Sequence, residues 1–400
     1  MIELRHRPPR PSRYRAIPAL IFSASAWIPA TSHAQSSVTL YGVLDTSIGY
    51  VTNAGGTSAA HRIGFVNSNI QSSGFGVKGK EDLGGGLSAI FDLQSIIVPT
   101  SGALAEKNTL FSLQSWVGLA SDKYGTLTFG RQYDPITDLV EPLTADIDFG
   151  ALFATVGNVD NYDALLHIND SIKYVSPTLA GFTLEAMASL NGVAGSASAG
   201  SVYSAAVSYT NGALSLAGGY MVNRVDNQTA LIGGIPAVTA STSADGLNYD
   251  NPIVQFANIR SNEIGRLGGQ YSFGPLAVGA AYSNSRFHQF DTNATLNFNS
   301  GSAFLHYMPG PLLGLAAGYS FTRATGSGAG ANYNQVSLGS DYFLSKRTDI
   351  YVSAVYQHAS GDTLSDADAL VPATASVGDE GFYGTGRSQF LSVVGMRHRF

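Results

Sequence analysis

An acidic segment without any Lys or Arg runs from Tyr133 to Ile168. Carboxylates on an exposed loop are simply solvated. Beside a confined aqueous space with low-dielectric walls, the same carboxylates would attract cations and select ions by charge. The candidates for this selection are the acids near the middle of the segment and then those at its start: Glu141, Asp146 and Asp148, followed by Asp134 and Asp138. The segment also holds Asp160 and Asp163.

Residues that could catalyse covalent chemistry are scarce and scattered. The chain has no Cys, and no Gly-x-Ser-x-Gly elbow stands in a strand–turn–helix setting. It has no His-Glu-x-x-His motif and no spacing typical of metal ligands. The Gly-rich runs at 84–86 and 326–330 lack a following Lys-Ser/Thr and read as turns. We therefore expect no enzyme, no cofactor and no metal centre, and keep an enzyme only as a remote alternative.

The composition narrows the class of protein further. Charged residues make up 12% of the 400 positions, about half the share usual in soluble domains, while hydrophobic residues make up 44%. Low charge without high hydropathy argues against both an ordinary soluble enzyme and a helical membrane protein. The 20 Tyr and 20 Phe argue against disorder. The net charge of −6 argues against a nucleic-acid partner, because phosphate binding needs clustered Lys and Arg.

The first 34 residues have the layout of a secretory signal peptide. Five arginines precede an apolar run from Ala16 to Ala30, which is too short to span a bilayer as a helix. Ser32-His33-Ala34 then places small residues at the positions that signal cleavage requires. An uncleaved amphipathic start is the alternative. Cleavage would remove five arginines and one glutamate, so residues 35–400 would carry a net charge of −10.

Beyond Gln35, apolar residues recur with a period of two. Between Thr39 and Tyr50, for example, residues of even number are mostly apolar and alternate with a mixed set. Successive side chains of a strand point to opposite faces, so each such segment has one apolar face and one mixed face. The same alternation recurs at 276–282, 315–321, 350–356 and 390–400. We count sixteen candidate strands and no run of 18 apolar residues.

Short turns alternate with long polar connections. The short turns are rich in Gly, Pro and Asn, and lie at 81–86, 123–125, 178–181, 211–212, 273–275, 309–311 and 345–348. The long connections include 133–168, 223–262 and 360–386. Short turns on one rim and long loops on the other are typical of an outer-membrane barrel. A soluble β-sandwich is the alternative, but its outer faces would carry more charge. We therefore predict an all-β fold, a 16-stranded antiparallel transmembrane β-barrel.

Six segments resemble, in the right order, the trimeric general porins of Gram-negative bacteria, especially the beta-proteobacterial group. They are SVTLYGVLD at 37–45, GFGVKGKEDLGGGL at 74–87, GTLTFGRQY at 125–133, NDSIKY at 169–174, LSKRT at 344–348 and VGMRHRF at 394–400. The resemblance covers essentially all of residues 35–400 as one domain. It implies that the third long loop, about 133–168, folds inward as a constriction. The terminal Phe400 resembles the signal that outer-membrane assembly machinery reads.

The resemblance implies a water-filled outer-membrane channel for passive diffusion of ions and small hydrophilic solutes. It implies a homotrimer, in contact with outer-membrane lipid and lipopolysaccharide, and no cofactor. A substrate-specific channel for sugars or organic acids is the closer alternative. Aromatic residues such as Tyr282, Tyr319 and Tyr356 have outward parity, however, and are more typical of interfacial girdles than of a sugar track.

Porins of this family oppose the loop acids with basic residues on the barrel wall, and here that set is incomplete. Gly74, Ser88 and His167 stand at positions that are often basic in the family. We therefore expect the pore to prefer cations or to be weakly selective. A titrating His167 would make conductance depend on pH, whereas a solvated loop histidine would not.

Three basic residues remain as candidates for the pore wall. Lys78 and Lys80 have the parity of the inward face. Arg131 instead shares the parity of Leu127 and Phe129, which should face lipid. Either a β-bulge re-aims Arg131 at the strand end or the residue lies above the membrane.

Overall fold

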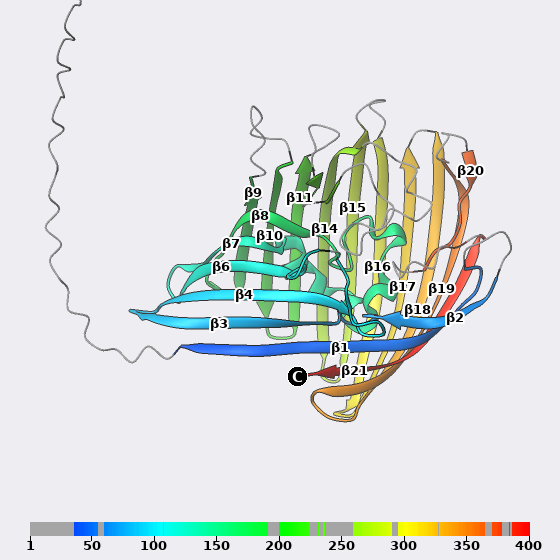
Figure 1. Cartoon of the computed structure of the whole chain (residues 1–400). Coiled ribbons are helices and arrows are strands. Elements are labelled where there is room, and N and C mark those ends of the chain that lie inside the picture. Colours follow the sequence, from blue (N-terminus) through cyan, green and yellow to red (C-terminus); the bar gives the residue numbers. More distant parts are fainter. Residues whose placement is uncertain are drawn as a thin grey trace, which may run out of the picture. The chain divides into compact units, whose positions relative to one another are not determined.

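The fold is described from a computed structural model of the chain (Figure 1). The structure describes residues 36–54, 60–106, 108–190, 200–224, 231–232, 235–236, 259–289, 295–326, 328–364, 370–377, 384 and 386–400. The expected signal peptide, residues 1–34, lies outside the described residues.

Sixteen antiparallel strands, each bonded to the next in chain order, form a closed barrel. They are β1 (Ser37–Val51), β3 (Gly74–Gly84), β4 (Leu87–Val98), β6 (Gln114–Ser121), β7 (Gly125–Tyr133), β8 (His167–Val175), β9 (Phe182–Ser189), β10 (Val202–Asn211), β11 (Leu214–Arg224), β14 (Ile259–Phe273), β15 (Leu276–Gln289), β16 (Thr295–Gly310), β17 (Leu313–Gly326), β18 (Ala329–Phe343), β19 (Thr348–Leu364) and β21 (Ser388–Arg399). The last strand, β21, pairs with β1 and closes the sheet (Figure 1). The predicted 16-stranded barrel is confirmed, and closure satisfies the backbone without a free edge.

Short extra strands extend the wall at the rim of the long loops. β2 (Arg62–Asn67) continues beside β1, β5 (Ala103–Leu104) pairs with β4, and β20 (Leu370–Pro372) pairs with β19. β12 (Leu231–Ile232) and β13 (Ile235–Pro236) pair only with each other among the described strands.

The two rims differ as the turn pattern predicts. On one rim the hairpins are tight; Gly274, between β14 and β15, has a positive φ of 63°, which only Gly adopts without strain. On the other rim, the connection from β7 to β8 contains α1 (Pro135–Val140), η1 (Glu141–Leu143), α2 (Asp146–Phe149), η2 (Gly150–Phe153) and η3 (Val156–Asn158). We call residues 134–166 of this connection the inward loop. None of the helices in the described part of the chain has the length and hydropathy to span a membrane.

The two faces of the wall differ in the way that the period-two pattern predicts. On β18, Leu338 is 57% exposed, whereas its neighbour Ser337 is fully buried. Tyr282, Tyr319 and Tyr356 are exposed on the outward face, as expected for aromatic girdles. The outward face is therefore the apolar surface that contacts lipid, and the inward face carries the polar side chains.

The inward loop packs against the inside of the barrel wall, as the resemblance implies. Ile136 and Val140 of α1 form one buried cluster with Met187 of β9, Met221 of β11 and Ile264 of β14. Figure 1 shows the short helices of the loop beside the strands of this wall. The loop therefore lies within the barrel and not above it.

Glycines on the wall make room for the aromatic side chains of the loop. A Cβ added to Gly318 of β17 would lie 2.2 Å from the ring of Phe153, and one added to Gly339 of β18 would lie 2.7 Å from the ring of Phe149. Any larger side chain at these two positions would displace a ring. The wall is thus shaped, residue by residue, to hold the inward loop.

Candidate functional site

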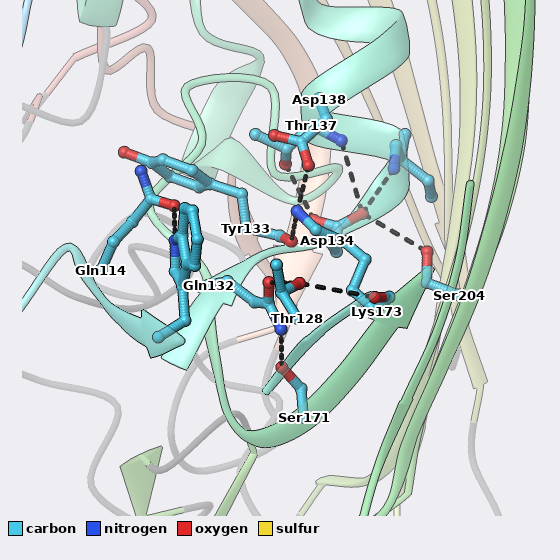
Figure 2. Close-up of polar contacts among 12 residues, drawn as sticks. Gln114, Thr128, Gln132, Tyr133, Asp134, Thr137, Asp138, Ser171, Lys173 and Ser204 are labelled. Atoms are coloured by element: carbon cyan, nitrogen blue, oxygen red, sulfur yellow. Dashed lines mark hydrogen bonds and ion pairs between the residues drawn. The ribbon is translucent and has the colours of Figure 1, made fainter. Parts of the chain in front are cut away.

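Asp134 begins the inward loop as the N-cap of α1. Its carboxylate accepts hydrogen bonds from the Ile136 backbone N–H at 2.8 Å and from the Thr137 hydroxyl at 2.8 Å. Pro135 follows at the first helical position, which suits its fixed φ. Ser204 of β10 donates a further hydrogen bond at 3.4 Å (Figure 2). Asp134 has no exposed surface, so it fixes the start of the loop and does not face channel water.

Asp138, one turn later, meets a basic residue of the wall. The Lys173 ammonium of β8 forms an ion pair with the Asp138 carboxylate and also donates to the Tyr133 carbonyl at 3.0 Å (Figure 2). Glu185 of β9 hydrogen-bonds to the same carboxyl. Burial raises the pKa of Asp138, and the Lys173 charge opposes that shift. At this corner of the site, the carboxyl groups of Asp138 and Glu185 both interact with the single ammonium of Lys173.

Glu141 and Asp146 form a carboxyl cluster with Asp163, which lies near the end of the inward loop. Asp146 hydrogen-bonds to both of the other side chains. Burial raises the pKa of Glu141 well above its usual range, and the charge of Asp146 adds to this shift. Burial likewise raises the pKa of Asp146 to about 6. At neutral pH this cluster therefore carries less negative charge than its formal count.

Arg266 of β14 is the wall residue that faces this carboxyl cluster. It is 2% exposed, and its guanidinium donates to the Asn161 carbonyl at 2.8 Å. The guanidinium carbon lies 4.9 Å from the centroid of the Tyr162 ring, a cation–π distance. Its charge opposes the upward pKa shifts of Glu141 and Asp146. Arg266 thus holds the second half of the loop to the wall through both charge and backbone.

The other two acids of the inward loop also meet the wall. Asp148 forms an ion pair with His306 of β16. Asp160 accepts a hydrogen bond from Ser283 of β15 and another from Thr155, within the loop, at 2.6 Å. In the described part of the chain, no three His, Asp or Glu side chains are arranged to hold a metal ion. Several acids that the sequence analysis assigned to ion selection, such as Asp134, Asp138 and Asp148, thus hold the inward loop against the barrel wall.

The wall bases that receive the loop were missed by the sequence analysis, although the alternation contains a signal for them. Lys173 has the inward parity of β8 and lies in the NDSIKY segment, and Arg266 has the inward parity of β14. His306 is an isolated ionisable side chain within an otherwise apolar strand end. Only the position of the inward loop, which depends on strands far apart in sequence, identifies them as its partners.

Lys78 and Lys80 of β3, which were predicted, do have the inward orientation. Lys78 lies opposite Thr39 of β1 and places its ammonium 4.8 Å from the centroid of the Tyr41 ring. The Tyr41 hydroxyl donates to Asp92 of β4 at 2.6 Å. Lys78, Lys80 and Asp92 line an open cavity of about 250 Å³, and both lysines are exposed. They face water rather than the inward loop.

A β-bulge at Arg131 changes the direction of its side chain. This is the first of the two arrangements expected from its parity; the second was a position above the membrane. The register between β7 and β8 shifts at this residue. The guanidinium donates to the Ser112 carbonyl at 2.6 Å and to the Asn169 side chain at 2.8 Å, and it lies 3.6 Å from the Glu106 carboxylate. Arg131 therefore ties the loop between β4 and β6 to β8.

His167 lies at the first position of β8 and is 1% exposed. Its ring packs against Tyr133, with 4.7 Å between the two ring centroids. Its carbonyl accepts a hydrogen bond from Arg131 at 3.3 Å. Because the imidazole is enclosed by protein, this position argues against the pH-sensing role expected for it.

Two arginines of the last strand add basic charge that the sequence analysis did not assign to the pore. Arg397 lies 3.1 Å from Asp349 and 3.2 Å from Asp341, and Arg399 lies 3.1 Å from Asp349. With His306 they line a cavity of about 170 Å³ under the inward loop. Their inward parity was visible, but the segment 394–400 was interpreted only as a family segment that ends in an assembly signal at Phe400.

Phe400 completes the seam between the last strand and the first. Its backbone exchanges two hydrogen bonds with Gly42 of β1, at 3.0 and 3.1 Å. A Cβ added to Gly42 would lie 2.3 Å from the Phe400 ring, so this glycine leaves space for the terminal aromatic side chain.

Comparison with known proteins agrees with the sequence motifs and with the barrel. A family profile described as Gram-negative porin matches residues 19–362. An outer membrane porin of Bordetella pertussis is 29% identical over 361 residues, which cover 83% of this chain and 91% of the relative. Outer membrane porin protein 32 of Delftia acidovorans is 28% identical over 391 residues, covering 92% of this chain and 95% of that protein. The relatives are porins of the outer membrane.

Solved structures share the fold. The anion-selective porin from Comamonas acidovorans aligns with a TM-score of 0.68 at 23% identity, covering 92% of this chain and all of that one. OmpT of Vibrio cholerae, solved in a trimer form, aligns with a TM-score of 0.63 at 19% identity over 91% of this chain. The family profile matches most of the chain, and the sequence motifs, the closed barrel and the inward loop agree with it. The chain therefore belongs to the Gram-negative porin family and is an outer-membrane β-barrel.

Proposed function

We propose that this porin is a water-filled channel for passive diffusion of ions and small hydrophilic solutes, and that it prefers cations or is weakly selective. The observation that supports this is an excess of acids around and below the inward loop. Besides the seven acids of the loop, the inner wall carries Asp45, Asp92, Glu185, Asp341 and Asp349. The bases of the same region are Lys78, Lys80, Lys173, Arg266, Arg397 and Arg399, with His306.

Two features keep the proposed selectivity modest. Acids such as Asp138 and Asp148 are paired with wall bases, and paired charges have weak fields at a distance. The raised pKa of Glu141 further reduces the negative charge of the loop at neutral pH. The anion selectivity of the Comamonas acidovorans porin belongs to that protein, and at 23% identity its likeness concerns the fold alone.

The sign of the selectivity is tested by reversal potentials of the purified protein in a planar bilayer under a KCl gradient. A potential on the cation side, or close to zero, is expected, and a clear anion preference would contradict the proposal. Arg399→Gln removes a base from the cavity under the loop and should shift the potential toward K⁺ selectivity. Lys346→Gln removes the same charge at an exposed turn between β18 and β19 and serves as the control.

We further infer that the protein is a homotrimer inserted by outer-membrane assembly machinery, with Phe400 as part of its recognition signal. The position of Phe400 at the barrel seam and a fold shared with a porin solved as a trimer support this inference. Deletion of Phe400 should lower the amount of protein in the outer membrane. Native mass spectrometry of the purified protein should give three copies, and a monomer would contradict the trimer.

The mature chain is proposed to begin at Gln35 after cleavage of the signal peptide 1–34. The basic start, apolar run and small residues before the cleavage point support this boundary. N-terminal sequencing of the protein from outer membranes tests it, and a retained Met1 would contradict it.

A further inference from the structure

Two arginines near the rim of the long loops point out of the barrel. Arg286 of β15 and Arg323 of β17 are exposed, and each alternates with buried neighbours such as Phe287 and Thr322 that face inward. Within the described part of the chain, neither guanidinium forms an ion pair or donates a hydrogen bond. Unpaired charge on a wall that faces lipid needs a partner or water.

The strand between the two arginines brings them toward one place. β16 lies between β15 and β17 (Figure 1), and Arg286 is opposite its Asn297 while Arg323 is opposite its Asn299. With about 4.8 Å between strands and about 3.4 Å between residues, the two Arg Cα atoms are separated by roughly 12 Å. Two extended guanidinium side chains can therefore reach a common group that lies over β16.

The electrostatic surroundings of the pair are mostly neutral. Asn299 accepts hydrogen bonds from the Tyr282 hydroxyl at 2.8 Å and from the Asn284 amide at 3.0 Å. Among the described residues, the acid that faces the pair is Glu263 of β14, opposite Arg286, and its carboxylate also lies 3.8 Å from the His288 ring. Arg323 has only Asn299 and Asn332 opposite it on the neighbouring strands. The patch thus has a net positive charge.

The depth of the patch is marked by aromatic side chains. One step toward the membrane from Asn299, Gly301 lies between Tyr282 of β15 and Phe321 of β17. Both rings are exposed to lipid, and a Cβ added to Gly301 would meet nothing within 4 Å. Aromatic girdles of barrels lie at the membrane–water interface. The guanidiniums therefore lie at the level of lipid head groups, with open apolar space directly below them.

We propose that Arg286 and Arg323 bind the phosphates of an anionic lipid in the outer leaflet, with an acyl chain against Gly301 between the two rings. Guanidinium is the side chain best suited to bidentate contact with phosphate. The positive charge of the patch favours a phosphorylated lipid. The arginines lie above the apolar space at Gly301, just as the head group of a lipid lies above its acyl chains. If a second copy of the barrel docked at this face in the same way, its own Arg286 and Arg323 would lie beside these two arginines. The like charges would repel one another.

The proposal is tested by binding of diphosphorylated lipid A to the purified protein in detergent micelles, measured by native mass spectrometry. The wild-type protein should retain the lipid, and lipid A stripped of its phosphates should bind much more weakly. Arg286→Ala/Arg323→Ala should lower the affinity by at least about tenfold, the ratio expected when one charge-assisted contact is lost. Arg286→Lys/Arg323→Lys keeps the charge and should recover part of the affinity.

The matched control is Lys346→Ala/Arg347→Ala, which removes two basic charges at an exposed turn on the opposite rim and should leave lipid binding unchanged. Circular dichroism and resistance to unfolding in SDS confirm that each variant is folded. Equal binding by the arginine variant and the wild-type protein would overturn the proposal. It is also overturned if lipid A stripped of its phosphates binds as tightly as the diphosphorylated lipid, or if the variant changes only the number of copies per assembly.

Discussion

Two parts of the inner wall use the same residue types for different purposes. The loop-facing wall comprises β8, β14, β15 and β16, where Lys173, Arg266 and His306 each meet acids of the inward loop. The open wall comprises β1, β3 and β4, where Lys78 and Lys80 border a cavity of about 250 Å³. Bases of the first wall are paired and fix the loop, whereas those of the second face water.

This difference separates the shape of the channel from its electrostatic potential. A charge that is paired and half-buried contributes mainly to where the loop lies, because its field is cancelled nearby. An exposed charge acts on passing ions but is screened by salt. Changes to the loop-facing wall should therefore alter conductance at every salt concentration. Changes to the open wall should alter selectivity only in dilute salt.

The largest effect is expected from Gly318→Ala on β17, next to the loop-facing wall. The new Cβ would lie 2.2 Å from the Phe153 ring, and such overpacking costs about 1–3 kcal/mol. The loop should be displaced, so single-channel conductance should change and become noisier in both dilute and concentrated KCl. Planar-bilayer recordings measure this effect.

Two further variants show whether the ring is the cause. Gly330→Ala on β18 is the control, since a Cβ there would meet nothing within 4 Å. Phe153→Ala in the Gly318→Ala background should remove the clash, so the two changes should not be additive. Wild-type conductance in Gly318→Ala would contradict the docking described for this loop.

A smaller effect is expected from Asp146, within the carboxyl cluster that faces Arg266. Burial raises its pKa to about 6, so the carboxyl is neutral below this pH and ionised above it. Cation preference should therefore increase as the pH rises from 5 to 7. A unit charge about 6 Å from an ion in water contributes roughly 0.7 kcal/mol, or about a threefold change in permeability ratio. Reversal potentials across this pH range measure it.

Asp146→Asn should make this step smaller. Asp122→Asn, at the exposed turn between β6 and β7, is the control with the same chemical change. If the step persists in Asp146→Asn, another group titrates there. Because Glu141 shares a hydrogen bond that lowers the pKa of Asp146, Glu141→Ala should move the midpoint of the step to higher pH.

The barrel could be predicted from sequence because its signal is local. Period-two alternation, as at Leu40 and Leu44, requires only neighbouring residues, and tight turns such as that at Gly274 require a particular backbone conformation. The strand number follows from the alternation and the turns, and the six family segments then identify the inward loop. Each of these signals can be read without knowledge of which strands meet across the barrel.

The roles of individual acids could be predicted only in part. Asp134 followed by Pro135 is a sequence signal for the start of a helix. The sequence analysis interpreted Asp134 as a pore charge and overlooked this signal. By contrast, the ion pairs of Asp138 with Lys173 and of Asp148 with His306 join residues 35 and 158 positions apart. Nothing in the local sequence specifies such pairs, because the docking of the loop decides them.

The smallest effect is expected from Lys80→Gln on the open wall. Lys80 is exposed, so its loss should move the reversal potential slightly toward cations in dilute KCl. At about 1 M salt the Debye length is only about 3 Å, and the shift should vanish. Gln114→Ala, a neutral change on β6, is the control for altered volume. A shift of equal size in dilute and concentrated KCl would mean that Lys80 shapes the channel as the bases of the loop-facing wall do, and the distinction between the two walls would then fail.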